Sequence, residues 1–322
     1  MVSININVQT QKRKFRLYEH PWLSLLVFIV TGVFSMGLTG TVIFGWIGLS
    51  GSSLTGSLAL EFSFKILSSF ILVPFVLRLP KGKRTYRQFL DDIGFTRVQP
   101  FVRLVALGLS CYFILALSQA VASLVYRFSE GLPVTWSFIR QVLDLSGDLP
   151  PSPSLLFSIA GALEEVGSRG ILLTVFLNRY SERKSIIFSS LVFGLMHLLN
   201  LTNGADVVWV MGQVTWAFII GLFYGYVFVR TRSLLPPMIV HYLGNAFISS
   251  LVGYIQIRAP VNIQVVYGVF LSLGIVPTVL MIWWTRFFTS KWLPGIIDLG
   301  NQKWKKLPSD HPAVYQPPAL EG

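Results

Sequence analysis

The sequence predicts an all-α membrane protein, a polytopic bundle of about eight transmembrane helices. Charged residues make up only 12% of the 322 residues and hydrophobic residues 53%, whereas soluble domains carry about 25% charged residues. The mean hydropathy is +0.63. Apolar runs of about 20 residues, the length needed to cross the hydrocarbon core, recur along the chain. This composition excludes a soluble globular fold.

The apolar runs define the expected spans in chain order. They cover residues 22–47, 57–78, 102–126, 154–177, 185–201, 207–229, 234–254 and 263–286. The fifth run is short for a span, so we expect it to bend or to be shielded by its neighbours.

Lys and Arg are concentrated in alternate connections between these spans. With the N-terminus inside, the inner cations lie in segments 12–16, 78–103, 179–184, 230–232 and 286–306. The outer connections carry only Arg127, Arg140 and Arg258. Cytoplasmic loops collect Lys and Arg, so we predict that both termini are cytoplasmic. We expect this multi-pass protein to lie in the plasma membrane. The net charge of +12 thus reflects topology, and no nucleic-acid partner is expected.

The spans also suggest an organisation of the chain into functional regions. We predict an N-terminal cytoplasmic segment 1–21, N-terminal membrane helices with an outer interfacial loop 22–153, catalytic core helices 154–254, a last membrane helix 255–286 and a cytoplasmic tail 287–322. In the outer loop, Trp136, Ile139, Val142 and Leu143 recur at helical spacing, which predicts a short interfacial helix.

The fourth span carries three charges, Glu164, Glu165 and Arg169. Each charge at the centre of a membrane helix costs about 2.5–3.5 kcal/mol, so these side chains should face the bundle interior. Glu165 and Arg169 are four residues apart and can pair, whereas Glu164 points about 100° away. The two carboxylates can therefore serve different purposes. In the second span, Glu61 and Lys65 share the same spacing and are also expected to pair.

Two further spans each place an imidazole in the bundle. These are His197 and His241, and Asn245 follows His241 by one helical turn. A single such residue is readily explained by helix packing, but this many polar groups on three spans indicate a shared functional site. A carboxylate and an imidazole can activate water, directly or through Zn²⁺, while a second imidazole and an amide can stabilise an oxyanion. Cys111 is expected to be a buried packing residue.

Three motifs in order carry a family resemblance. They read Glu164-Glu165-Val-Gly-Ser-Arg169, Phe193-Gly-Leu-Met-His197 and His241-Tyr-Leu-Gly-Asn245. The chain resembles the CPBP intramembrane peptidases, which include the CAAX prenyl endopeptidases. The resemblance covers roughly 154–253. One position departs from the family pattern, because Ser168 stands where an aromatic residue commonly precedes the motif Arg, and we expect thinner packing there.

The resemblance implies a role for each motif residue. Glu164 and His197 would activate water, His241 and Asn245 would stabilise the oxyanion, and the Glu165–Arg169 pair would support the site. Glu164, His197 and His241 could together ligate Zn²⁺, and a metal-free mechanism would use the same side chains.

Three functions are compatible with such a site. The first is an endopeptidase acting on a membrane-bound or lipidated peptide, with membrane lipids and that substrate as partners. The second is a non-catalytic scaffold of the same fold, such as a protein conferring immunity to a bacteriocin. The third is a proton-coupled permease, although the sequence shows no repeated halves. The complete set of motif residues favours the endopeptidase.

Overall fold

A computed structural model describes residues 20–77, 85–129, 153–247 and 263–293, together with residues 17, 131, 133, 135 and 136. These described residues form helices and contain no strand, which confirms the predicted all-α class. Most of the interfacial helix expected around residues 136–143 and most of the two terminal segments lie outside the described residues.

Several helical runs combine more than one helix type. The first part of the chain contains α1 Pro21–Gly40, η2 Thr41–Trp46, α2 Leu54–Ile66, η3 Leu67–Leu72, α3 Val73–Leu77, α4 Tyr86–Asp92 and α5 Phe101–Ser129. The second part contains α7 Pro153–Ala162, η4 Val166–Leu173, α8 Thr174–Leu177, α9 Glu182–Met196, η5 His197–Asn203, α10 Val207–Thr231, α11 Leu235–Phe247 and α13 Ile263–Trp292. Of the η segments, η2, η3 and η4 are π-helical and η5 is a 3₁₀-helix.

Five helical runs in the described part of the chain are long and apolar enough to cross a membrane. They are Pro21–Trp46, Leu54–Leu77, Phe101–Ala122, Glu182–Thr202 and Val207–Thr231. The other three predicted spans are also occupied by helices, but these helices do not meet the same length and hydropathy criteria among the described residues. The chain is therefore a multi-pass membrane protein, and the count of eight stays a prediction.

Two boundaries differ from the sequence prediction. The span expected at 154–177 is interrupted between α7 and η4, because the helix changes from α to π geometry around the charged residues. The last helix, expected to end at residue 286, continues to Trp292. Its final turns carry the aromatic side chains of Trp284, Phe287 and Trp292, which pack against one another.

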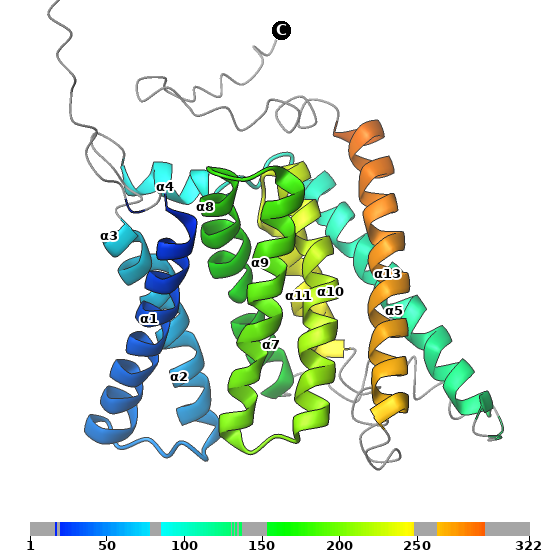
Figure 1. Cartoon of the computed structure of the whole chain (residues 1–322), viewed down its shortest axis with the longest axis horizontal. Helices are drawn as coiled ribbons and strands as arrows, with labels where there is room; N and C mark the ends of the chain where they lie inside the picture. The colour runs from blue at the N-terminus through cyan, green and yellow to red at the C-terminus, as the bar shows by residue number, and fades with distance from the viewer. Residues whose placement is uncertain are drawn as a thin grey trace, which may run out of the picture.

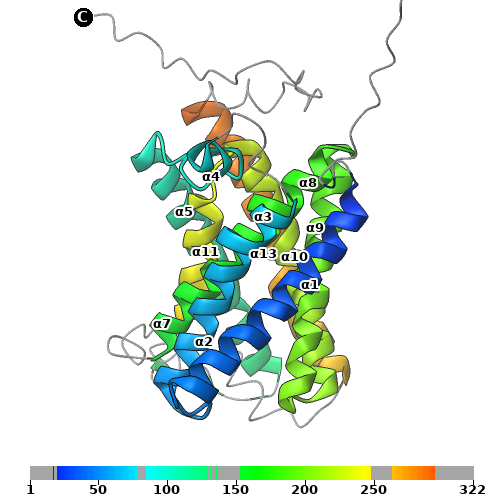
Figure 2. The same cartoon turned by 90° about the vertical axis from the view of Figure 1, so that its left-hand side faces the viewer.

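The helices are arranged around a central group (Figure 1). The α1–α2 pair lies on one side, α5 and α13 lie on the other, and α7 to α11 lie between them (Figures 1 and 2). Helix α9 packs along α10 where Gly194 permits close approach, since a Cβ there would lie 2.8 Å from the Val214 carbonyl oxygen. The central group thereby brings α7, α9, α10 and α11 together around one interior.

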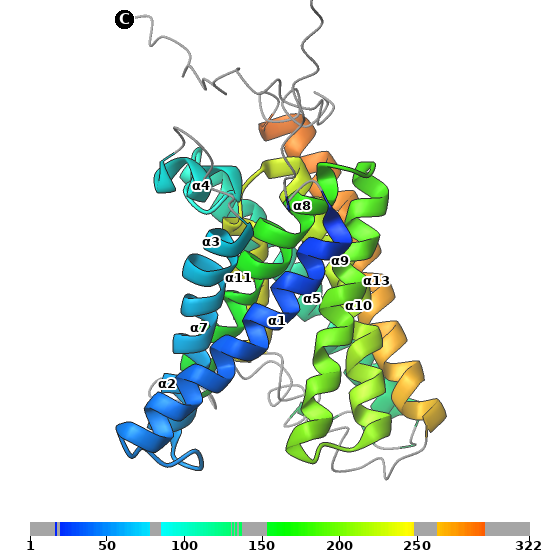
Figure 3. The ribbon, with the colours of Figure 1, turned by 60° about the vertical axis from the view of Figure 1, so that its left-hand side comes forward.

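The ends of the helices separate the connections into two sets. Helix α4, the α8–α9 and α10–α11 connections and the end of α13 lie at one end of the bundle, whereas the α1–α2 and α9–α10 connections lie at the other (Figures 1 and 3). At the first end, the Leu234 amide donates to the Gly94 carbonyl at 3.0 Å, which joins the segment after α4 to the α10–α11 turn. The connections predicted to be cytoplasmic are thus on one side.

Candidate active site

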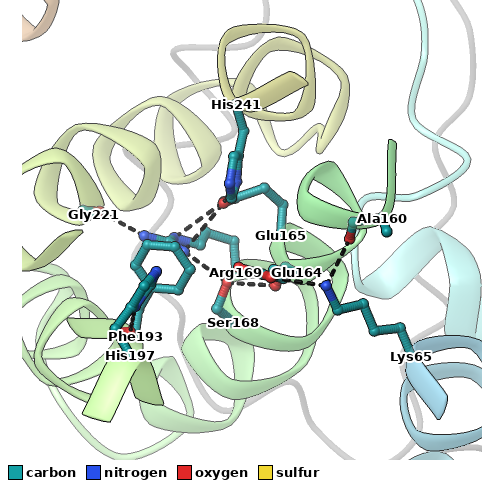
Figure 4. Close-up of polar contacts among 10 residues, drawn as sticks. All are labelled: Lys65, Ala160, Glu164, Glu165, Ser168, Arg169, Phe193, His197, Gly221 and His241. Carbon is teal, nitrogen blue, oxygen red and sulfur yellow. Dashed lines mark hydrogen bonds and ion pairs between the residues drawn. The ribbon is translucent and has the colours of Figure 1, made fainter. Parts of the chain in front are cut away.

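The two adjacent carboxylates lie where one helical run changes geometry. Helix α7 ends at Ala162, and the π-helix η4 begins at Val166, so Glu164 and Glu165 occupy the junction. π-Helical turns are rare and occur frequently at functional sites. Here the junction directs Glu165 toward α11 and Glu164 toward α2 (Figure 4).

Glu165 and Arg169 form the buried centre of the site. Both side chains are 0% exposed, and Arg169 Nη1 donates to Glu165 Oε1 at 3.3 Å. Arg169 Nε lies 3.3 Å from Glu165 Oε2. The pairing predicted from the four-residue spacing is therefore confirmed.

The Arg169 guanidinium also links three other elements of the site. Nη2 donates to the Gly221 carbonyl oxygen of α10 at 3.2 Å, and the guanidinium carbon lies 4.1 Å from the ring centre of Phe193 in α9. A side chain at Gly221 would place its Cβ 2.9 Å from Nη2. Arg169 thus holds η4 against both α9 and α10.

His241 reaches the same carboxylate from α11. Its Nδ1 lies 2.8 Å from Glu165 Oε1, and its ring stacks on Tyr224 with centres 5.4 Å apart and planes 11° apart. An ionised carboxylate only accepts hydrogen bonds, so Nδ1 is the donor in this contact. Nε2 of His241 then carries a hydrogen only when the ring is protonated.

His197 occupies the point where α9 changes into the 3₁₀-helix η5. Its Nδ1 lies 2.9 Å from the Phe193 carbonyl oxygen, which can only accept. Nδ1 therefore carries the hydrogen, and Nε2 of the neutral ring presents a lone pair. The Phe193 ring contacts both imidazoles edge-on, with centres 5.2 Å from His197 and 6.0 Å from His241. Phe193 is buried, and its ring contacts both imidazoles of the site.

Asn245 lies one turn beyond His241 on α11, opposite Gly161 of α7. A Cβ at Gly161 would lie 2.5 Å from Asn245 Nδ2 and 3.6 Å from His241 Nε2. The absence of a side chain at Gly161 therefore leaves room for both polar groups. The structure brings the motif residues of three helical runs to one place in the bundle.

Residues 150–247 match the family model described as Type II CAAX prenyl endopeptidase Rce1-like. We refer to residues 150–247 as the Rce1-like domain, because they match this family model. The match confirms the family resemblance predicted from the three motifs, all of which lie inside it. Neither a curated protein nor a solved structure matches the chain.

Glu164 has a partner that lies outside the Rce1-like domain. Lys65 Nζ of α2 is 2.9 Å from Glu164 Oε1 and 2.8 Å from Glu61 Oε2. The Glu61–Lys65 pair predicted from the four-residue spacing is confirmed, whereas the contact between Lys65 and Glu164 was not predicted. The only sign of this contact in the sequence was a lysine inside an apolar span. Helical spacing predicts contacts within one helix but not between helices.

Ser168 corrects another expectation from the sequence. We expected the missing aromatic residue to thin the packing, but Ser168 is buried and its hydroxyl makes two hydrogen bonds. Oγ donates to the Glu164 carbonyl oxygen at 2.7 Å and accepts from Arg169 Nη1 at 2.7 Å. Ser168 in the Rce1-like domain is thus a polar link between the backbone at Glu164 and the buried guanidinium.

The predicted zinc ligands do not converge in this arrangement. Among the residues that the structure describes, no group of three His, Cys, Asp or Glu side chains is placed to hold a metal ion. The Glu164 carboxylate faces Lys65, and His241 uses Nδ1 for Glu165. The side chains of the Rce1-like domain therefore do not fit a three-ligand zinc site as they lie here, and we assign no chemical step to a metal.

Proposed function

We propose that this protein is an intramembrane endopeptidase that hydrolyses a peptide bond in a membrane-bound or lipidated peptide. The proposal is carried by one observation, which is the grouping of Glu164, His197 and His241 around the buried Glu165–Arg169 pair of the Rce1-like domain (Figure 4). Asn245 joins this group opposite Gly161, where the Nε2 atom of His241 also lies. Peptide hydrolysis requires a base for water and donors for the oxyanion, and this group contains both.

Glu164 and His197 are the proposed activators of water. Glu164 lies within electrostatic range of both imidazoles. Nε2 of His197 presents a lone pair, because Nδ1 donates to the Phe193 carbonyl. A water between the carboxylate and Nε2 would lose a proton as its oxygen adds to the scissile carbonyl carbon. The same proton then passes to the departing amine when the carbon–nitrogen bond breaks.

His241 and Asn245 are the proposed oxyanion donors. Asn245 Nδ2 faces Gly161, and the protonated His241 ring would donate through Nε2. Glu165 accepts from Nδ1 and thereby compensates the charge of that ring. Arg169 holds Glu165 from the other side, so the buried pair orients the donor rather than contacting the substrate.

The proposed substrate class follows from the location of the site and from the domain match. The site lies among apolar helices, which a peptide anchored in the bilayer can reach and which a soluble protein would not enter. The description of the matching family names CAAX prenyl endopeptidases, so we propose CAAX-type processing near the C-terminus of a lipidated substrate. We further propose that both chain termini are cytoplasmic and that the protein lies in the plasma membrane.

The test compares membrane peptides from cells that express wild type or Glu164→Gln. The substitution keeps the size of the side chain and removes the carboxylate. A matched control is Asp206→Asn, because it also removes one carboxylate, and Asn retains the ability to cap α10. We expect new peptide ends with wild type and with Asp206→Asn, and none with Glu164→Gln. Equal peptide profiles from all three folded proteins would refute the protease and favour the scaffold.

Metal content is a separate measurement. Because the predicted ligands do not converge, we expect purified protein to hold substoichiometric zinc and to retain peptide cleavage after treatment with a chelator. Zinc bound at one equivalent, and lost in His197→Ala, would instead establish the ligand set predicted from the sequence.

A further inference from the structure

Lys65 is a charged side chain that the family match does not include. It lies on α2, far in sequence from the Rce1-like domain, and its side chain is only 12% exposed. Its ammonium nitrogen is 2.9 Å from Glu164 Oε1, 2.8 Å from Glu61 Oε2 and 3.2 Å from the Ala160 carbonyl oxygen (Figure 4).

These contacts use the full hydrogen-bonding capacity of the ammonium group. A lysine ammonium has three N–H donors, and here each has one acceptor. Lys65 is therefore not placed to bind an anionic group of a substrate. Its three acceptors instead fix the position of the ammonium between α2 and α7.

The acceptor on α7 connects Lys65 to the helix junction. The last four carbonyl groups of a helix lack partners within that helix, and Ala160 is one of these residues in α7. One side chain of α2 thus binds both the end of α7 and the first carboxylate after it. The same contact opposes the charge of Glu164, which would otherwise be costly among apolar helices.

We propose that Lys65 is a positioning residue for Glu164. Lys65 holds Oε1 of the carboxylate, which leaves Oε2 as the oxygen that faces the water. This inference rests on the proposed peptidase function and adds α2 to the active site. It predicts that removal of the ammonium impairs turnover without preventing substrate binding.

The activity test compares Lys65→Met with Lys65→Arg, using a peptide whose cleavage by wild type has been established. The matched control is Lys291→Met, because Lys291 is exposed and stacks near Phe287 and Trp292 at the end of α13. We expect Lys65→Met to lower kcat about 100-fold, the size of a general-base contribution. KM should stay within about twofold, since substrate binding is not removed. Lys65→Arg should recover part of kcat, and Lys291→Met should resemble wild type.

A second measurement does not depend on cleavage. Thermal unfolding in detergent micelles is compared for Lys65→Met, Glu164→Gln and the double variant. A direct ion pair predicts that both single changes lower the unfolding temperature and that the double change lowers it by less than their sum. Additive shifts would overturn the proposed contact. If Lys65→Met does not fold, Lys65→Gln and its double variant with Glu164→Gln supply the same comparison, because Gln also removes the positive charge.

The outcomes separate this inference from the proposed function. One outcome is that folded Lys65→Met has the kcat of wild type although the unfolding cycle shows coupling between Lys65 and Glu164. Lys65 would then have only a structural role, and the inference would be overturned. The inference is also overturned if KM rises while kcat is unchanged. If wild type itself cleaves nothing, the proposed function fails and the positioning role fails with it, whereas the unfolding cycle still reports whether the ion pair exists.

Discussion

Glu165 illustrates how single residues stabilise charge inside the bundle. Its carboxylate, which is 0% exposed, receives Arg169 from its own helical run and His241 from α11. Uncompensated buried charges cost several kcal/mol, so each partner depends on the others. The spacing in the sequence predicted the Glu165–Arg169 contact, but the contact with His241 required the packing of two helices.

At this scale we predict that breaking the buried pair destabilises the protein strongly. Arg169→Met should lower the free energy of unfolding by about 3–5 kcal/mol, because it leaves Glu165 buried without its guanidinium. The control is Arg97→Met, which breaks the partly exposed pair with Asp91 at 2.9 Å and should cost at most about 1 kcal/mol. Unfolding in micelles measures both values, and similar losses would contradict this assignment of Arg169.

At the scale of the elements, the junction between α7 and η4 decides how the site is assembled. The charged residues within an apolar span indicated that residues 164–169 are functional. A continuous helix was expected there, whereas the structure has a change of helix type. The change to π geometry occurs where the chain packs closely against other elements. A Cβ at Gly167 would lie 3.0 Å from the Phe28 ring of α1, and one at Gly170 would lie 3.1 Å from the Ile93 carbonyl oxygen. No periodicity of apolar residues reports such a change.

The close approach of α7 to α11 at Gly161 leads to a prediction about the position of Asn245. Gly161→Ala places a Cβ 2.5 Å from Asn245 Nδ2 and should displace the amide. Misplacement by about 1 Å can cost on the order of 100-fold in rate, so we expect at least about a tenfold loss of kcat/KM. Gly244→Ala is the matched control on α11, because its Cβ would meet only Leu115 at an ordinary 3.7 Å. Equal activity of the two variants would contradict the proposed place of Asn245.

At the scale of the whole molecule, the arrangement of connections agrees with the separation of charge along the sequence. Helix α4 and the α10–α11 connection lie at one end of the bundle, and the α1–α2 connection lies at the other (Figure 1). The sequence predicts that the first end faces the cytoplasm, since the cationic segments belong to it. This orientation is a prediction that labelling can test.

The single native cysteine makes that test direct. Cys111 is buried at 0% exposure and should not react with an impermeant thiol reagent. Ser52→Cys introduces a thiol into the α1–α2 connection, and Thr96→Cys introduces one after α4. In intact cells we expect labelling of Ser52→Cys alone, and in opened cells labelling of both. Labelling of Thr96→Cys in intact cells would reverse the predicted topology.

The sequence by itself determined the membrane class, the helical architecture and the six motif residues. Composition and run length are sufficient for the class, because a bilayer requires long apolar helices. Five of the six motif residues are ionisable, and they were recognisable because ionisable groups are rare in such helices and are seldom placed there without a function. Asn245 was recognisable from its place one turn after His241. The described helices follow the predicted spans closely at their beginnings, although the number of spans stays a prediction.

Only the tertiary structure decided which of these residues meet. Lys65 and Glu164 are 99 positions apart, and Glu165 and His241 are 76 positions apart. Ser168 became a link to Arg169, although its place in the motif had suggested a loss of packing. Helical periodicity determines which side chains share a face of one helix, whereas contacts between helices depend on how those faces pack.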